Sequence, residues 1–167
     1  ASALPEDFHW GVYFLSFFPY AEGPTFVEHH RERGGWSAID EMHGEYPTTS
    51  AEIVRPETYG SDAYGEAVVR DRNGPGWDRI GVENGSDFAS VGRAGIASMF
   101  AYTAYAGEGP GVIARDEFRN SGTDGLDRDR PYAYDVPHTE GWYADRLHAY
   151  ERDGEVAYVW NVTFNDA

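Results

Sequence analysis

Apart from six histidines, every basic side chain in this sequence is an arginine, and the 13 arginines face 29 aspartates and glutamates. The formal net charge is therefore −16, and a compact fold with this charge repels itself unless the solvent screens it. In molar salt the Debye length falls to about 3 Å, so neighbouring surface carboxylates barely repel one another. The sequence therefore predicts a protein of an extreme halophile, or of a virus that infects one.

Lysine, glutamine and cysteine are all absent from the 167 residues. A GC-rich genome disfavours lysine codons and offers a simpler explanation for that absence, whereas adaptation to salt also explains the acidic excess. Without cysteine, neither a disulfide framework nor a thiolate metal site can form.

The chain is 41% hydrophobic and 16% aromatic, which argues against a disordered acidic segment, because such segments are poor in aromatic residues. We expect a single domain over residues 1–167. No hydrophobic run is as long as a membrane helix, and residues 1–5 lack the basic and apolar regions of a signal peptide. We also expect no nucleic-acid partner, because no arginine cluster outweighs its acidic neighbours.

Residues that favour strands and turns dominate the composition, with 12 Tyr, 9 Phe, 20 Gly and 9 Pro. The clearest element is a strand over residues 155–164, where apolar and other side chains alternate. Residues 9–18 are apolar on both alternating faces, which predicts a strand buried on both sides. We expect a mainly β fold, an antiparallel sandwich, jelly roll or barrel with one or two short helices. The alternative is an α+β sheet with helices on one face.

Two short helices are predicted, at residues 24–33 and 139–152. Pro24 near its start and Gly34 after its end favour the first. The second rests on the spacing of Tyr143, Leu147 and Tyr150. Further short strands are predicted at residues 52–55, 63–70, 79–83, 96–105 and 131–136. The polar residues 120–130 predict a surface loop.

Histidines beside acidic residues are the first candidates for a metal site. Glu28, His29 and His30 lie on the first predicted helix, and Glu41 and His43 follow it. Imidazole and carboxylate groups can bind zinc together. The spacing matches no zinc-protease motif, however, and adjacent residues on a helix point about 100° apart. We predict no metal site and expect one histidine of the pair in the core and the other in solvent.

Two further histidines are candidates for acid–base chemistry. His138 lies two residues before Glu140, and His148 follows in the second predicted helix. Such pairs can transfer protons, but no nucleophile in a recognisable setting accompanies them. We predict no catalytic residue. A small halophilic enzyme that uses His138 or His148 with an acidic partner remains the alternative function.

Three other motifs have simpler interpretations. The segment Gly107–Gly111 lacks the phosphate-binding glycine pattern and predicts a turn, so no cofactor site is expected. Asp124, Asp127 and Asp129 could bind Ca²⁺ but lack the EF-hand spacing, which favours a solvated loop. Asn84 and Asn161 each begin a glycosylation triplet, and the second lies in a predicted strand.

The 26 aromatic residues are more than a core of this size needs. Tyrosine, tryptophan and arginine are enriched at protein interfaces. Because molar salt screens surface ion pairs, assembly must then rely on apolar and aromatic contacts. This favours a non-enzymatic assembly protein that forms homo-oligomers or binds other proteins. A third hypothesis is a module that stacks glycans or other ligands on exposed aromatic rings.

The segment Pro131–Gly141, with the sequence PYAYDVPHTEG, resembles a short stretch of tail-completion and minor capsid proteins of tailed viruses. In that family a Pro-Tyr-Ala strand start precedes a histidine and an acidic residue or glycine. Here the spacing has an extra residue, and the Thr-Gly-Ala-Leu-Arg stretch usually found upstream is absent. The resemblance implies a non-enzymatic part of a head–tail virion.

A capsid jelly roll of a haloarchaeal virus is equally compatible with the composition. The expected partners are then copies of the chain or other virion proteins. The expected location is the virion, assembled in the cytoplasm of a halophilic host, and the alternative location is the cytoplasm.

Overall fold

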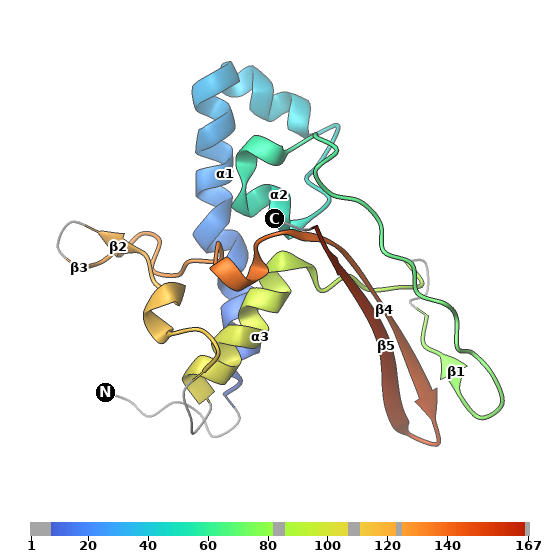
Figure 1. The fold of residues 1–167 in the computed structure, drawn as a ribbon. Helices are drawn as coiled ribbons and strands as arrows, with labels where there is room; N and C mark the ends of the chain where they lie inside the picture. Colours follow the sequence, from blue (N-terminus) through green and yellow to red (C-terminus); the bar gives the residue numbers. More distant parts are fainter. Residues whose placement is uncertain (1–7, 82–85, 107–110, 123–124, 166–167) are drawn as a thin grey trace. The chain divides into compact units, whose positions relative to one another are not determined.

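The computed structural model describes residues 8–81, 86–106, 111–122 and 125–165 (Figure 1). The chain forms two compact units. The first unit consists of Ala1–Gly60 and Arg93–Glu140, and the second consists of Ser61–Gly92 and Gly141–Ala167. The single folding domain expected over residues 1–167 stays a prediction.

The first unit is built on helix α1, which runs from Trp10 to Met42. The Nδ1 atom of His9 caps the helix by accepting a hydrogen bond from the Val12 N–H at 3.2 Å. Gly35, with φ of 68°, interrupts the helical backbone, so α1 consists of two helical stretches that meet at a kink. Glycine adopts this left-handed conformation without a steric penalty.

The strand predicted at residues 9–18 is wrong, and the helix predicted at residues 24–33 is part of α1. The buried side chains in this region are Phe14, Phe18 and Ala21, and their spacing of four and three residues is the helical period. Exposed Val12 lies just before them, and exposed Leu15 lies between the first two. These exposed apolar residues made the run appear apolar on both faces of a strand and hid the helical period.

The strand predicted at residues 52–55 is also wrong, because these residues lie largely in helix α2, Ser50–Val54. A capping box explains the helix: the Glu52 N–H donates to the Thr49 hydroxyl at 3.2 Å, and the Thr49 N–H donates to the Glu52 carboxylate at 2.9 Å. The two bonds satisfy backbone groups that a helix start leaves unpaired. A short 3₁₀ helix, η1 (Pro56–Thr58), follows.

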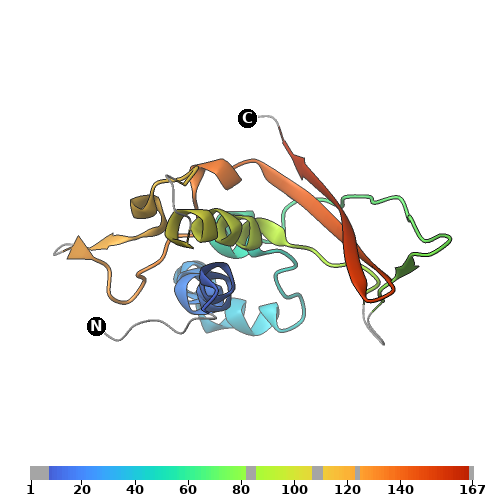
Figure 2. The same ribbon diagram turned by 90° about the horizontal axis from the view of Figure 1, so that it is seen from below.

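Helix α3, Gly92–Ala106, occupies the segment where a strand was predicted at residues 96–105. Figure 2 shows α3 lengthwise next to the first stretch of α1, which is seen end-on, so the two helices cross. The buried side of α3 is a row of alanines at helical spacing, and their small size leaves room for the phenylalanine rings of α1 in the core. The core of the first unit contains Phe14, Phe18, Ala21, Ala94, Ala97, Ala101, Ala104, Ile113, Phe118, Tyr134 and Val136.

The remainder of the first unit is short elements and loops. The surface loop predicted at residues 120–130 contains a small hairpin of β2 (Ser121–Gly122) and β3 (Gly125–Leu126). It is preceded by the 3₁₀ helix η2 (Arg115–Phe118), and η3 (Pro137–Thr139) ends the unit.

The strand predicted at residues 131–136 is reduced to one isolated bridge between Arg119 and Tyr132. Tyr134 and Val136 enter the core instead, and the Tyr134 hydroxyl donates to the Phe14 carbonyl of α1. The segment that resembles the viral proteins therefore packs the core of the first unit.

The second unit contains an antiparallel sheet in the order β1–β4–β5. Strand β1 is Asp78–Arg79, β4 is Trp142–Arg152 and β5 is Glu155–Phe164. Asp153 and Gly154 form the turn between β4 and β5 with φ of 51° and 83°. An Asp-Gly pair is favoured where both residues of a two-residue hairpin turn have positive φ.

The strand predicted at residues 155–164 is confirmed as β5, whereas the helix predicted at residues 139–152 is wrong, because strand β4 occupies most of it. Ala144, His148 and Tyr150 are buried at even-numbered positions of β4, which is the period of a strand. Of the strand predicted at residues 79–83, only Arg79 lies in β1, and residues 82 and 83 lie outside the described residues. Residues 63–70 form no strand.

The described residues thus combine α-helices with small antiparallel sheets and do not form the predicted β sandwich, jelly roll or barrel. Continuous apolar runs carry no clear period, so the start of α1 and most of α3 were predicted as strands. Among the described helices, none is both long enough and apolar enough to cross a membrane.

Candidate interaction surface

Asp145 of β4 is buried and organises one face of the β4–β5 hairpin. Its carboxylate accepts hydrogen bonds from the Ser90 hydroxyl at 2.9 Å and from the backbone N–H groups of Val91 and Gly92 at 2.7 and 2.8 Å. The indole N–H of Trp160 donates to the same carboxylate at 2.9 Å. One side chain thus connects the segment before α3 to both long strands.

The opposite face of the hairpin is covered by the chain before β1. The Asn161 side chain donates to the Val68 carbonyl at 3.0 Å, and the Tyr150 hydroxyl accepts from the Arg72 N–H at 2.9 Å. Arg146 lies 3.7 Å from the Glu66 carboxylate. This covering explains why Ala67 and Val69 are buried.

His148 is buried on this covered face, and its Nε2 atom lies 2.8 Å from the Arg79 guanidinium. Its Nδ1 atom is buried and has no hydrogen-bond partner within the described part of the chain. Burial lowers the pKa of His148, and the charge of Arg79 lowers it further. The neutral imidazole therefore accepts a hydrogen bond from Arg79, which also pairs with Asp87 at 3.2 Å.

We expect the second unit to lose stability as the pH falls from about 7 to about 5, because protonated His148 would lie buried beside Arg79. A histidine whose pKa is lowered on folding adds stability above its unfolded pKa of about 6.5. That stability is lost as the pH falls toward the folded pKa. Urea unfolding at several pH values measures the effect, with His148→Gln as the control that cannot take up the proton. Equal pH dependence in both proteins would contradict this role.

The other candidate for acid–base chemistry, His138, is exposed and lies near the Phe100 ring. Its expected acidic neighbour, Glu140, pairs with Arg55 at 3.1 Å. His148 is in core packing, as described above. Within the described segments, therefore, neither histidine lies in a closed site with an acidic partner.

The predicted helical histidine cluster is also used structurally. Glu28 forms an ion pair with Arg31 at 2.5 Å on α1, while His29 and His30 are both half-buried. The pKa of His30 is lowered, chiefly by burial. His43 is exposed in the loop after α1. Among the described residues there is no group of three or more potential metal ligands.

The remaining sequence motifs form a local turn or lie at least partly outside the described residues. The Asp127 carboxylate accepts the N–H groups of Asp129 and Arg130 at 2.9 Å each, as in a local turn. Asp124, Asn84 and residues 107–110 lie outside the described residues.

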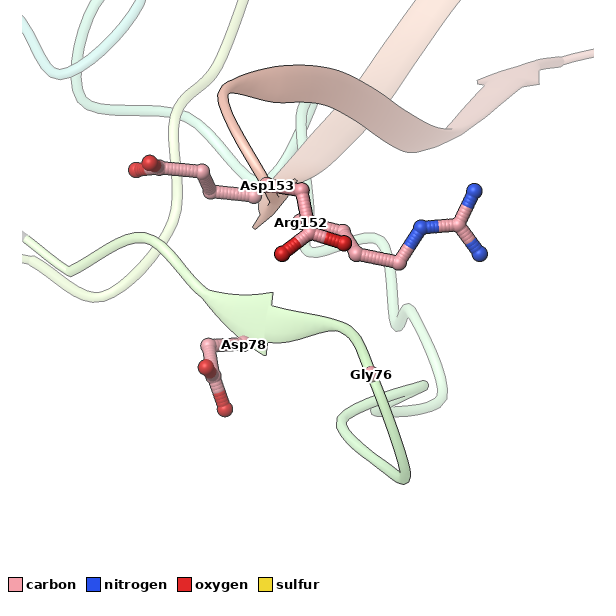
Figure 3. A pocket seen from close by; sticks show the side chains of 5 residues that line it. Gly76, Asp78, Arg152 and Asp153 are labelled. Carbon is pink, nitrogen blue, oxygen red and sulfur yellow. The ribbon is translucent and has the colours of Figure 1, made fainter.

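A surface pocket beside the hairpin turn is lined by Gly76, Asp78, Glu151, Arg152 and Asp153. Figure 3 shows the Arg152 side chain extending away from Asp78, and its guanidinium lies over the Trp77 ring at 4.4 Å. The pocket is mostly acidic and open, and we assign no ligand to it.

The most exposed apolar surface of the second unit is one face of β5. Val156, Tyr158, Trp160, Val162 and Phe164 share this face, because side chains alternate along a strand. Val156, Tyr158 and Phe164 are 70%, 68% and 45% exposed, and the other two are partly exposed. We call these five side chains the β5 apolar face.

The outer edge of β5 is unpaired within the described part of the chain, because β5 is the last strand of its sheet. Leu147 exchanges backbone hydrogen bonds with Ala89 at 2.8 and 3.0 Å, so its backbone groups point away from β5. Its β5 partner is Trp160. In an antiparallel ladder, the backbone groups of Trp160 and of alternate residues such as Tyr158 then point to the outer edge.

Residues 79–167, which include β4 and β5, match a family described as a domain of unknown function, DUF8575. The match covers more than half of the chain. The chain belongs to the DUF8575 family. The DUF8575 match includes Asp145, His148 and the β5 apolar face, whereas α1 and α2 lie outside it. No curated protein and no solved structure gives a significant match to the chain.

Proposed function

We propose that this chain is a non-enzymatic assembly protein that binds other protein chains through the β5 apolar face and the free edge of β5. One observation carries the proposal. The three longest stretches without a charged residue are 8–21, 94–107 and 156–165. The first two supply buried residues of α1 and α3 to the core of the first unit, whereas the third is mostly exposed on β5.

An exposed strand without any charged residue is unusual in a chain where one residue in four is charged. Proteins normally protect a free sheet edge with charged side chains, proline or a bulge. Between Val156 and Phe164, β5 has no charge and no proline, and its ladder with β4 is regular from Ala144 onward. A partner that covers this strand explains why the usual protection is missing.

The high salt concentration expected for a halophilic protein also favours binding through the uncharged β5 strand. Molar salt screens contacts between charged surfaces, whereas apolar contacts and backbone hydrogen bonds persist. A halophilic assembly protein would therefore use an uncharged strand in preference to ion pairs.

The virion is the assembly that we propose, specifically a capsid or head–tail component of a virus of halophilic archaea. The support is the acidic, lysine-free composition together with the resemblance of Pro131–Gly141 to tail-completion and minor capsid proteins. Assembly would then take place in the cytoplasm of the halophilic host.

A ligand-binding module is the second candidate, because Tyr158 and Phe164 expose aromatic rings on the same sheet face. Valines flank these rings, and the Trp160 indole N–H is already bonded to Asp145. Few polar groups remain there to bind sugar hydroxyls, so the surface fits a protein partner better.

Expression of the tagged full chain in a halophilic host tests the proposal. We expect it to elute from a multimolar-salt lysate at a size well above its mass of 18.6 kDa. Tyr158→Asp should return it to the size of the monomer. Tyr46→Asp is the matched control, because Tyr46 is 66% exposed but lies in the first unit. Elution of the unmodified chain as a monomer in the lysate would overturn the proposal.

A further inference from the structure

We propose that the partner at the free β5 edge is the β5 strand of a second copy of this chain, paired antiparallel about a two-fold axis. The inference rests on the proposed function, because it names the occupant of the same surface. It predicts a dimer in which β4 and β5 of the two copies form one continuous sheet.

The backbone of β5 is suited to pair with itself. Alternate residues, including Tyr158, Trp160 and Val162, direct their N–H and C=O groups to the outer edge. With the two-fold axis at Trp160, Tyr158 of each copy lies opposite Val162 of the other. The outward-facing backbone N–H and C=O groups of one copy then lie opposite those of the other along the whole strand. The apolar side chains of the two strands also lie next to one another.

Charge selects the antiparallel direction. Glu155 and Asp153 lie at the turn end of β5, and residues 156–165 carry no charge. With the axis at Trp160, an antiparallel pair places each Glu155 opposite uncharged Asn165 of the other copy, whereas a parallel pair in register would place each carboxylate directly opposite its own copy. Like charges directly opposite one another destabilise a strand pair. Two chains of net charge −16 can thus approach along their least charged exposed strand.

The available area suits a weak dimer. Tyr158 and Phe164 are 68% and 45% exposed, and an aromatic side chain can bury roughly 150–250 Å². The β5 apolar face then exposes on the order of 400 Å² in each copy, or on the order of 800 Å² in two copies. Specific interfaces begin near about 1,200 Å² in total. Edge-to-edge pairing extends the sheet and buries only the sides of these side chains, so the dimer lies below that range and is expected to be weak.

Sedimentation of the purified full chain in multimolar KCl is the first test. We expect a dimer whose fraction rises with concentration. Tyr158→Asp should raise the dissociation constant at least about tenfold, because a carboxylate would replace the apolar contact between Tyr158 and Val162 of the facing strand. Tyr46→Asp, with matched exposure, should leave it unchanged, and circular dichroism establishes that both variants are folded.

Single cysteine substitutions provide a second test, and each changes only one side chain of the surface. Any disulfide can be assigned to the introduced residue, because the chain has no cysteine of its own. A disulfide requires Cα atoms about 4.4–6.8 Å apart. In the antiparallel dimer only a residue at the two-fold axis meets its own copy. We therefore expect oxidation to crosslink one position within residues 158–162 and neither Val156→Cys nor Phe164→Cys. The double variant Val156→Cys/Phe164→Cys should crosslink between copies if the axis lies at Trp160.

The outcomes separate this inference from the proposed function. A purified chain that stays monomeric at all concentrations overturns self-pairing, and the proposed function survives if Tyr158→Asp still removes the chain from the complex in the lysate. A dimer without any crosslink in β5 also overturns self-pairing, because the copies then meet elsewhere. Crosslinking at every position would show a parallel pair and contradict the antiparallel arrangement.

Discussion

Transfer of the purified chain from multimolar salt to below about 0.5 M monovalent salt is expected to unfold it. Of the acidic residues in the described segments, only Glu22, Glu52 and Asp145 are buried, so most of the negative charge lies at the surface. The Debye length grows from about 3 Å at 1 M to about 10 Å at 0.1 M, which spans neighbouring surface carboxylates. Many small repulsions then add up against a total stability of only about 5–15 kcal/mol.

Circular dichroism during stepwise dialysis measures this loss. Lowering the pH toward the pKa of the surface carboxylates should partly replace the salt, because protonation removes the repelling charges. A cooperative, folded protein in 50 mM NaCl at pH 7 would contradict the halophilic interpretation. Codon bias alone would then have to account for the absence of lysine.

Asp145→Ala is expected to lower the free energy of unfolding of the second unit by about 3 kcal/mol or more. The Asp145 carboxylate accepts four hydrogen bonds, from Ser90, Val91, Gly92 and Trp160. The substitution would leave all four donors without this acceptor. Each buried donor left unpaired costs about 1–3 kcal/mol, and water entering the cavity recovers part of this loss.

Urea unfolding in multimolar KCl, followed by tryptophan fluorescence, measures the change. Asp78→Ala is the control, because Asp78 is an exposed aspartate of the same unit, and its loss should change stability by less than about 0.5 kcal/mol. Similar effects of the two substitutions would show that Asp145 does not organise the hairpin. Asp145→Asn should fall between them, because its amide retains one acceptor oxygen.

The C-terminal strand could be predicted because its two faces differ. Apolar and other side chains alternate from Glu155 to Phe164, and the Asp153–Gly154 turn immediately before it is a local hairpin signal. The partner strand β4 could not be recognised, because Tyr143, Leu147 and Tyr150 imitate a helical spacing. Pairing with β5 outweighs that local pattern, as expected where tertiary contacts override propensity.

The candidate site was only partly visible in the sequence. The surplus of aromatic residues indicated an interface, but not that Tyr158 and Phe164 of β5 would be among those exposed. Asp145 and the Arg79–His148 pair were not expected as structural centres, because their partners lie 15 to 69 positions away along the chain. The one local signal for Asp145 was an acidic residue among Trp142, Tyr143 and Leu147.

The charge of the chain, its lack of disulfides and the alternating strand β5 follow from the sequence by itself, because each depends on composition or on neighbouring residues. Tertiary structure alone decided that residues 10–23 are helical and that β4 is a strand. It also decided that two of the three long uncharged stretches supply buried residues to the core of the first unit and that the third is mostly exposed. Burial depends on which distant segments cover a residue, and a local sequence pattern does not show which segments those will be.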